Sequence, residues 1–309
     1  MKEYAAMPQW KELLLAGGVA ISVVFSPALG APTTSPPEFS PNPGVGWIVL
    51  RGQFRPPPSG PGPVVNDPAH PNVNGNDLRA TGRQPTFPVA DVNNPILQPW
   101  AKEQLRKHNE RILSGKPGFS RTASCWPIGV PGFVLYGVQP VYFIQGPKEV
   151  VMVWQTDHQV RRVYLADKHS ARVKPSWFGE SIGHYEGDTL VVDTIGIDTR
   201  TFVDNYETPH TDRLHVIERF HLIDGGNTLE VNLHVEDPGA FTTPWNAVQL
   251  YHRSEPPKSG KAPLEAESVG GTSSAAEPGP LIESVCAENN VSYFGNDAFP
   301  IPKADKPDF

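Results

Sequence analysis

Residues 214–236, LHVIERFHLIDGGNTLEVNLHVE, decide the fold class of this chain. Apolar and polar side chains alternate over 214–223 and again over 228–236, which is the period of a half-buried β-strand. The sequence DGGN separates the two runs, and glycine and asparagine favour tight turns. The stretch therefore predicts an antiparallel hairpin with one apolar and one polar face.

The same pattern continues on both sides of this hairpin. Further strands are expected at 133–136, 141–145, 149–155, 160–165, 180–186, 189–195 and 246–252. One helix is expected before them, because Pro99 can open a helix over 99–113 and Gly115 and Pro117 can end it. Sequential short strands with almost no helix predict a mainly β fold. We expect an antiparallel meander that is closed or half closed into a lipocalin-like barrel.

Composition excludes several other classes of protein. The 309 residues carry 26 lysines and arginines against 33 aspartates and glutamates, a net charge of −7. This balance argues against nucleic acid as a partner, because phosphate binding needs a basic surface. The 35 prolines and 28 glycines argue against a coiled coil or a helical bundle, since so many helix breakers do not fit into loops alone.

The amino end resembles a secretory signal peptide. Residues 13–25 form an uncharged apolar run that follows Lys2 and Lys11 and precedes small residues. The run is short for a membrane span, and cleavage is expected near Gly30-Ala31. An uncleaved anchor is the alternative. We therefore expect a periplasmic or secreted protein and not a multi-span membrane protein.

The rest of the chain divides by composition into three parts. Residues 31–95 are rich in proline and predict an extended arm, within which 46–54 is a possible edge strand. Residues 96–295 are expected to form a single domain, interrupted by a polar low-complexity insertion at 254–280. The tail is 296–309.

The two cysteines, Cys125 and Cys286, both follow the signal segment. In an oxidising compartment such a pair predicts one disulfide, and two buried thiols are the alternative. The sequence contains no CxxC pair, phosphate-binding glycine loop, dinucleotide-binding glycine motif or HExxH motif. We therefore expect neither a metal nor a cofactor.

Glu218 is the first candidate for chemistry, because it is the one ionisable residue on the apolar face of the 214–236 hairpin. Burial raises the pKa of a carboxyl group unless a cation meets it, and such a group suits general acid or base catalysis. The alternative is a buried structural ion pair with Arg161 or Arg162 from the strand 160–165.

Three further residues are candidate proton-transfer groups. His158 follows an aspartate near the aromatic and arginine-rich strands, His210 lies in the loop sequence ETPHTD, and Asp193 lies in the strand 189–195. A turn histidine held by its neighbours is the alternative for both histidines. Side chains that would orient an oxygen-rich or anionic substrate are expected at Arg161, Arg162, Tyr164 and Trp154.

Two motif matches are disfavoured. Ser181 lies in a GxSxG match, which requires a sharp turn followed by a helix, but a hairpin sequence follows here. A metal site that combines Glu218 with His215 and His221 is also disfavoured. On a strand the two histidines are about 20 Å apart, and Glu218 points to the other face.

A series of sequence blocks in fixed order resembles a widespread family of exported, mostly uncharacterised bacterial proteins. The blocks are CWPIGVP (125–131), HQVRRVY (158–164), SW (176–177), SIG (181–183), EGDTLVVDT (186–194), PH (209–210), LHVIERF (214–220), EDP (236–238), PW (244–245) and CAENN (286–290). The match covers residues 95–295, roughly. The resemblance implies export and one folded unit, and it implies no particular activity.

Together these observations predict a secreted or periplasmic acid–base enzyme without redox chemistry, a hydrolase or lyase that acts on a small compound. The first alternative is a periplasmic ligand-binding barrel without turnover, in which the same polar groups only hold a small molecule. The second is an envelope-associated structural module whose proline-rich arm docks a partner.

Overall fold

The computed structural model describes residues 35–41, 44–50, 52–72, 87–115, 125–135, 140–155 and 159–254. All of them belong to the same structural unit of the chain. The expected signal peptide, His158, Cys286, residues 255–280 of the insertion and the tail lie outside the described residues. The predicted disulfide and the role of His158 therefore stay predictions.

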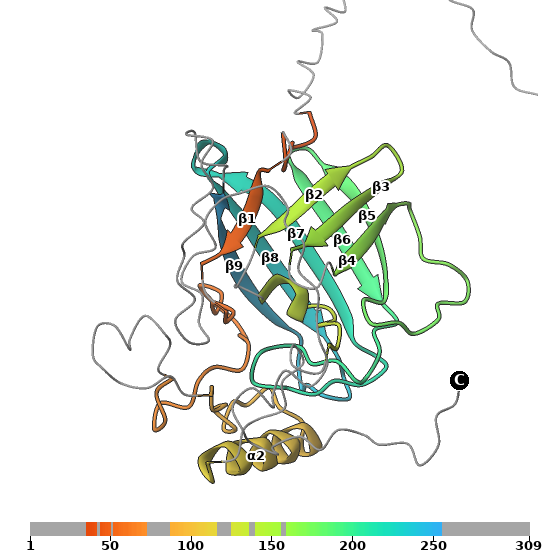
Figure 1. The fold of residues 1–309 in the computed structure, drawn as a ribbon. Helices are drawn as coiled ribbons and strands as arrows, with labels where there is room; N and C mark the ends of the chain where they lie inside the picture. Colours follow the sequence, from red (N-terminus) through yellow and green to blue (C-terminus); the bar gives the residue numbers. More distant parts are fainter. Residues whose placement is uncertain are drawn as a thin grey trace, which may run out of the picture. The chain divides into compact units, whose positions relative to one another are not determined.

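Nine strands form a closed barrel in the described part of the chain (Figure 1). In chain order they are β1 (Gly46–Val49), β2 (Val141–Gln145), β3 (Glu149–Trp154), β4 (Val160–Leu165), β5 (Glu180–Glu186), β6 (Thr189–Ile195), β7 (His215–Ile223), β8 (Thr228–Glu236) and β9 (Trp245–Ser254). Each strand pairs antiparallel with the next, except that β4 and β5 are parallel. The prediction of a mainly β, lipocalin-like barrel is confirmed.

The hairpin at 214–236 is present, with the expected apolar and polar faces. Strands β7 and β8 pair from His215 opposite Glu236 to Ile223 opposite Thr228. A short 3-10 turn, η3 (Asp224–Gly226), joins them, and φ is 65° at Gly225. Glycine adopts this left-handed conformation without a steric penalty, so the turn sequence and the strand alternation specify the same hairpin.

Strand β1 closes the barrel, although its sequence suggests an edge strand. It pairs with β2 at Trp47 and Val141, and with β9 from Gly46 and Ser254 to Val49 and Tyr251. The reason is its composition: all four residues of β1 are buried, so both of its faces need cover. The arm around it also contacts the barrel.

The prediction of a strand at 133–136 is wrong for residues 133–135, the part that the structure describes. They belong to a 3-10 helix, η1 (Gly132–Leu135). All four residues of η1 are buried, so the segment has no alternating exposed face that would mark it as a strand. The hydroxyl of Tyr251 on β9 donates to the carbonyl of Val134 at 2.6 Å. Figure 1 shows η1 among the strands of the barrel.

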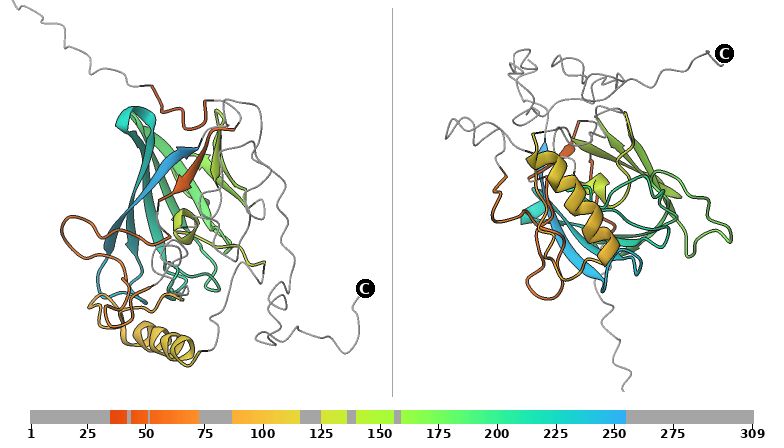
Figure 2. Two further views of the ribbon diagram at one scale, coloured as in Figure 1. Left: turned by 60° about the vertical axis from the view of Figure 1, so that its left-hand side comes forward. Right: turned by 90° about the horizontal axis from the view of Figure 1, so that it is seen from below.

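The helix α2 (Pro99–Leu113) lies at the lower end of the barrel in Figure 1, and the view from below in Figure 2 shows it crossing that end. Its starting residue follows Gln98, whose backbone N–H donates to the carbonyl of Ala240. Within the described ranges, no helix is both long enough and apolar enough to span a membrane.

Side chains that alternate toward the inside of the barrel form its core. The buried apolar cluster draws members from every strand except β5. The two buried residues of β5 are small, Ser181 and Gly183, and the partly buried Tyr185 packs against the cluster from the same strand. A Cβ on Gly183 would lie 2.8 Å from Val163 Cγ1 on β4, so glycine allows the close approach of these two strands. The small β5 residues leave space for a buried polar group.

Candidate functional site

That buried polar group is an ion pair between β4 and β7. The Nη1 atom of Arg161 donates to Glu218 Oε1 at 2.9 Å, and Nη2 contacts Glu218 Oε2. Both side chains are 0% exposed. The sequence left two interpretations of Glu218 open, a general acid or base and a structural ion pair. The contact that the structure shows is the ion pair with Arg161.

Two hydroxyl groups complete the coordination of the Arg161 guanidinium. Ser181 Oγ lies 3.3 Å from Nε and 3.2 Å from Nη2, and Thr194 Oγ1 lies 3.0 Å from Nη2. The two hydroxyls lie 2.9 Å from each other. Ser181 is therefore part of a buried strand network, in agreement with the sequence argument against a nucleophile elbow. The Arg161–Glu218 network is buried, and its polar atoms bond to one another across the strands of the barrel.

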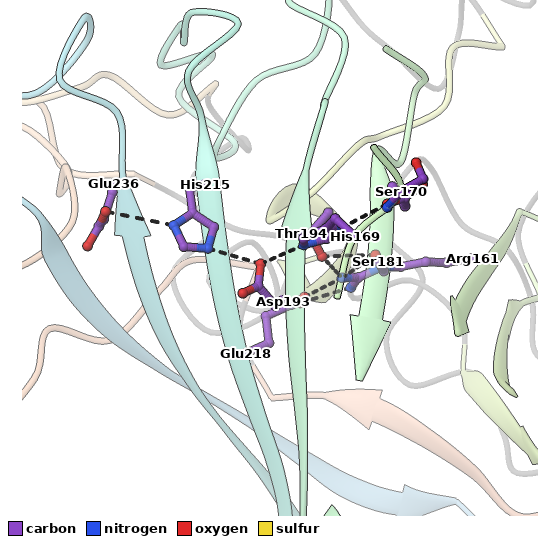
Figure 3. A network of polar contacts seen from close by, with 10 residues as sticks. Arg161, His169, Ser170, Ser181, Asp193, Thr194, His215, Glu218 and Glu236 are labelled. Carbon is purple, nitrogen blue, oxygen red and sulfur yellow. Dashed lines mark hydrogen bonds and ion pairs between the residues drawn. The ribbon is translucent and has the colours of Figure 1, made fainter. Parts of the chain in front are cut away.

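A second polar network lies on the outer face of the barrel, where side chains are accessible. Asp193 on β6 is its centre: Oδ1 lies 3.0 Å from His169 Nε2 and 3.0 Å from His215 Nε2 (Figure 3). The Asp193 side chain is 38% exposed and that of His215 is 31% exposed. One carboxylate oxygen thus accepts from two imidazole rings at a position that solvent reaches.

The network extends to both sides of Asp193. On one side His169 Nδ1 lies 3.0 Å from Glu180 Oε1; on the other His215 Nδ1 lies 3.7 Å from Glu236 Oε2. Glu236 Oε1 is in turn 2.8 Å from His234 Nε2. We call this the imidazole–carboxylate chain; its members are Glu180, His169, Asp193, His215, Glu236 and His234.

The parallel pairing of β4 with β5 brings His169 to this face. Parallel neighbours need a connection that returns along the sheet, and residues 166–179 form this crossover (Figure 1). Ser170 fastens it to β5, because its backbone N–H and its hydroxyl donate to Glu180 at 2.7 and 2.5 Å. The crossover packs against Gly196, just after the end of β6. A Cβ on Gly196 would lie 2.3 Å from Val173 Cγ1, so this position requires glycine.

Hydrogen bonds within the chain shift the protonation equilibria of its members. The bond to Asp193 raises the pKa of His215, although burial opposes the shift. The bonds from His215 and then from His169 lower the pKa of Asp193. The Ser170 hydroxyl lowers the pKa of Glu180, and His234 lowers that of Glu236. The carboxylates therefore stay ionised while His215 holds its proton to higher pH, so His215 can act as a general acid.

His210 has a buried, structural environment. Its Nε2 lies 2.8 Å from Thr201 Oγ1, and its Nδ1 lies 2.8 Å from the carbonyl oxygen of Thr211. Burial lowers the pKa of His210, and its Nδ1 donates to the Thr211 carbonyl. Both of its nitrogens are engaged in holding the loop between β6 and β7.

The other residues expected at a site are dispersed. Trp154 is buried and stacks on Phe133, with ring centroids 5.2 Å apart. Arg162 lies outside, where it pairs with Glu149 and its guanidinium lies 5.3 Å from the Tyr164 ring centre. The structure therefore joins Arg161 with Glu218 and places Trp154 against the same Phe133 ring that Arg161 approaches at 5.7 Å, whereas Arg162 and Tyr164 lie outside the barrel.

Asp193 and Glu218 also lie on opposite faces of the barrel wall. In the β6–β7 register Glu218 is opposite Val192, and Asp193 is opposite Ile217. Since successive side chains alternate between faces, Glu218 points inward and Asp193 outward. The two carboxylates do not form one site.

Sequence reasoning missed His169, His215, Glu180 and Glu236 as partners of Asp193. Part of the signal was available, because counting outward from the 224–227 turn places His215 opposite Glu236 on the polar face of the hairpin. No local pattern marks His169, which reaches Asp193 through the crossover. Among the described residues, no group of three or more histidine, cysteine, aspartate or glutamate side chains is arranged to hold a metal ion.

A groove of about 550 Å³ lies where the arm meets the connection before β9. Its wall is mainly apolar and includes Pro56, Pro61, Pro63, Asn94, Ile96 and Thr242. It is separate from the imidazole–carboxylate chain, none of whose residues lines it.

Comparison of the chain with protein-family models, with curated proteins and with solved structures gives no match. The resemblance carried by the sequence blocks therefore stays a prediction.

Proposed function

We propose that this protein is a secreted or periplasmic acid–base enzyme without redox chemistry, a hydrolase or lyase, with Asp193 at the centre of its site. The observation that carries the proposal is the shared Asp193 oxygen, which lies 3.0 Å from both His169 and His215 on an accessible face. A carboxylate that fixes an imidazole and favours its charged form is a recurrent element of acid–base sites.

In this proposal His215 is the proton donor and Asp193 orients it. The bond to Asp193 raises the pKa of His215, so its ring stays charged to a higher pH than a free histidine and can protonate a leaving-group oxygen or nitrogen as the bond to it breaks. In a hydrolysis the attacking water returns a proton to the neutral ring, and the protein ends the cycle unchanged. In an elimination the proton comes from the carbon next to the leaving group.

The proposal is tested with the variants His215→Gln and Asp193→Asn and a panel of chromogenic carboxylate esters, phosphate esters and glycosides. We expect turnover to fall about a hundredfold or more in His215→Gln, the range that a positioned acid contributes. His184→Gln is the matched control. His184 is an exposed β5 histidine that pairs with Glu186, and neither residue belongs to the imidazole–carboxylate chain. Unchanged turnover in both site variants rules the proposal out.

The groove favours one second candidate, ligand binding without turnover. Its apolar wall and few polar side chains suit a small apolar molecule. It lies beside the arm, and none of its lining residues belongs to a strand of the barrel. A ligand there would shift the amide signals of Thr242 and Thr243 and leave the Asp193 signal unchanged.

A further inference from the structure

The crossover that supplies His169 also carries three cationic side chains, Lys168, Arg172 and Lys174. All three are exposed. None of them forms a salt bridge with a described residue, whereas Arg162, Arg200 and Arg219 are all paired with carboxylates. Uncompensated charge on a surface creates an attractive potential for ions of the opposite sign.

This positive charge is local. Residues 166–177 contain one acidic residue, Asp167, against the three cations, in a chain whose net charge is −7. The nearest carboxylates of the imidazole–carboxylate chain, Glu180 and Asp193, already face the His169 ring, one at each of its nitrogens. Their negative charge is therefore directed to histidine, and the cations of the crossover are left facing solvent.

We propose that the crossover binds the anionic group of the substrate, so that molecules processed at the Asp193 centre carry a phosphate, sulfate or carboxylate. The inference rests on the proposed function. The three cations would hold this group beside His169, and the same crossover fixes His169 against Asp193, so anion binding and proton donation occur at adjacent positions of the chain. Lysine and arginine side chains are the usual partners of such groups.

The test uses the full chain and titrates inorganic phosphate, sulfate and acetate separately, followed by calorimetry and by amide chemical shifts. Three titrations distinguish the three anionic groups. We expect saturable binding of at least one of them, with shifts centred on 168–174. The double variant Lys168→Glu, Lys174→Glu should weaken this binding about tenfold, because electrostatic attraction dominates it.

The matched control is Lys102→Glu, Lys107→Glu. Both lysines are exposed and belong to α2, so the net charge changes equally away from the crossover. The milder variant Lys168→Gln, Lys174→Gln covers the case in which charge reversal disturbs folding, and it should weaken binding less. Equal losses in the test and control variants overturn the proposal, and so does the absence of saturable binding.

This result is separable from the proposed function. His215→Gln should lower turnover about a hundredfold or more and keep the affinity for the anion, because His215 lies on β7 and not on the crossover. If the wild-type protein and all variants bind the anion but none shows turnover, the crossover is an anion site and the proposed enzymatic function is contradicted. Turnover of neutral substrates alone, with no anion binding, would remove the anion site and keep the enzyme.

Discussion

Glu218 and Asp193 show how the environment of one residue separates two carboxylates on neighbouring strands. Glu218 is buried inside the barrel, where its charge pairs with that of Arg161. Asp193 lies outside, and its charge orients two histidines. Alternation along each strand is sufficient to predict the side of the wall on which each carboxylate lies.

We expect Glu218→Gln to lower the free energy of unfolding by about 3–5 kcal/mol, because Arg161 then remains buried without a counter-charge. Urea unfolding measures the loss. Glu149→Gln is the control, since the Arg162–Glu149 pair is partly exposed and should cost less than about 1 kcal/mol. A small loss in both variants contradicts the assignment of Glu218 to a buried ion pair.

The pH dependence of stability follows from the Asp193–His215 pair. The raised pKa of His215 means that its stabilisation is complete below 6.5 and is lost as pH rises through the folded value. The lowered pKa of Asp193 means that its stabilisation is complete above 3.8 and is lost as pH falls. The pair therefore stabilises the fold most between pH 3.8 and 6.5.

Urea unfolding of the wild-type protein and Asp193→Asn across pH 4 to 8.5 measures this contribution. We expect a difference below about 1 kcal/mol, because both side chains are partly solvated, and we expect it to shrink as the pH rises above 6.5. Asp188→Asn in the β5–β6 turn is the control and should show no such trend. A difference that grows with pH has the wrong sign for this pair.

At the scale of elements, the crossover 166–179 determines the site. It exists because β4 and β5 are parallel, and it is the one departure from the expected meander among the described strands. It positions His169. Its docking depends on Gly196, which has φ of 69° and where an added Cβ would lie 2.3 Å from Val173 Cγ1.

Gly196→Ala should lower the free energy of unfolding by about 1–3 kcal/mol, from backbone strain and from the clash with Val173. It should also shift the NMR signals of the His169 ring. The control is Gly225→Ala, where φ is 65° but no atom lies within 4 Å of an added Cβ. The control therefore reports the strain alone. Equal losses in the two variants would show that the crossover does not dock at Gly196.

The elements that the sequence predicted best are those with a strict period and a turn. The β7–β8 hairpin has both, and its turn and its two faces are as expected. The segment at 132–135 is apolar throughout, so it has no period that distinguishes a strand from the observed η1. Arg161 could be chosen over Arg162 as the partner of Glu218 only with the strand register, and His169 could be found only with the crossover.

At the scale of the whole molecule, the prediction that stays open is the disulfide between Cys125 and Cys286. In the chain-entropy model such a long loop contributes about 4–5 kcal/mol. Peptide mapping under non-reducing conditions should recover the two cysteines in one linked fragment. Recovery of both as free thiols from protein made in an oxidising compartment would contradict the disulfide.

The strand β1 has a consequence for the order in which the fold forms. Its residues pair with β9, so Gly46 and Ser254 meet across about 200 positions of sequence, a separation that makes pairing slow. The hairpins from β5 to β9 can form earlier from near neighbours. The seam between β1 and β9 therefore closes last, and a growing or truncated chain that ends before residue 245 has every other strand and still no closed barrel.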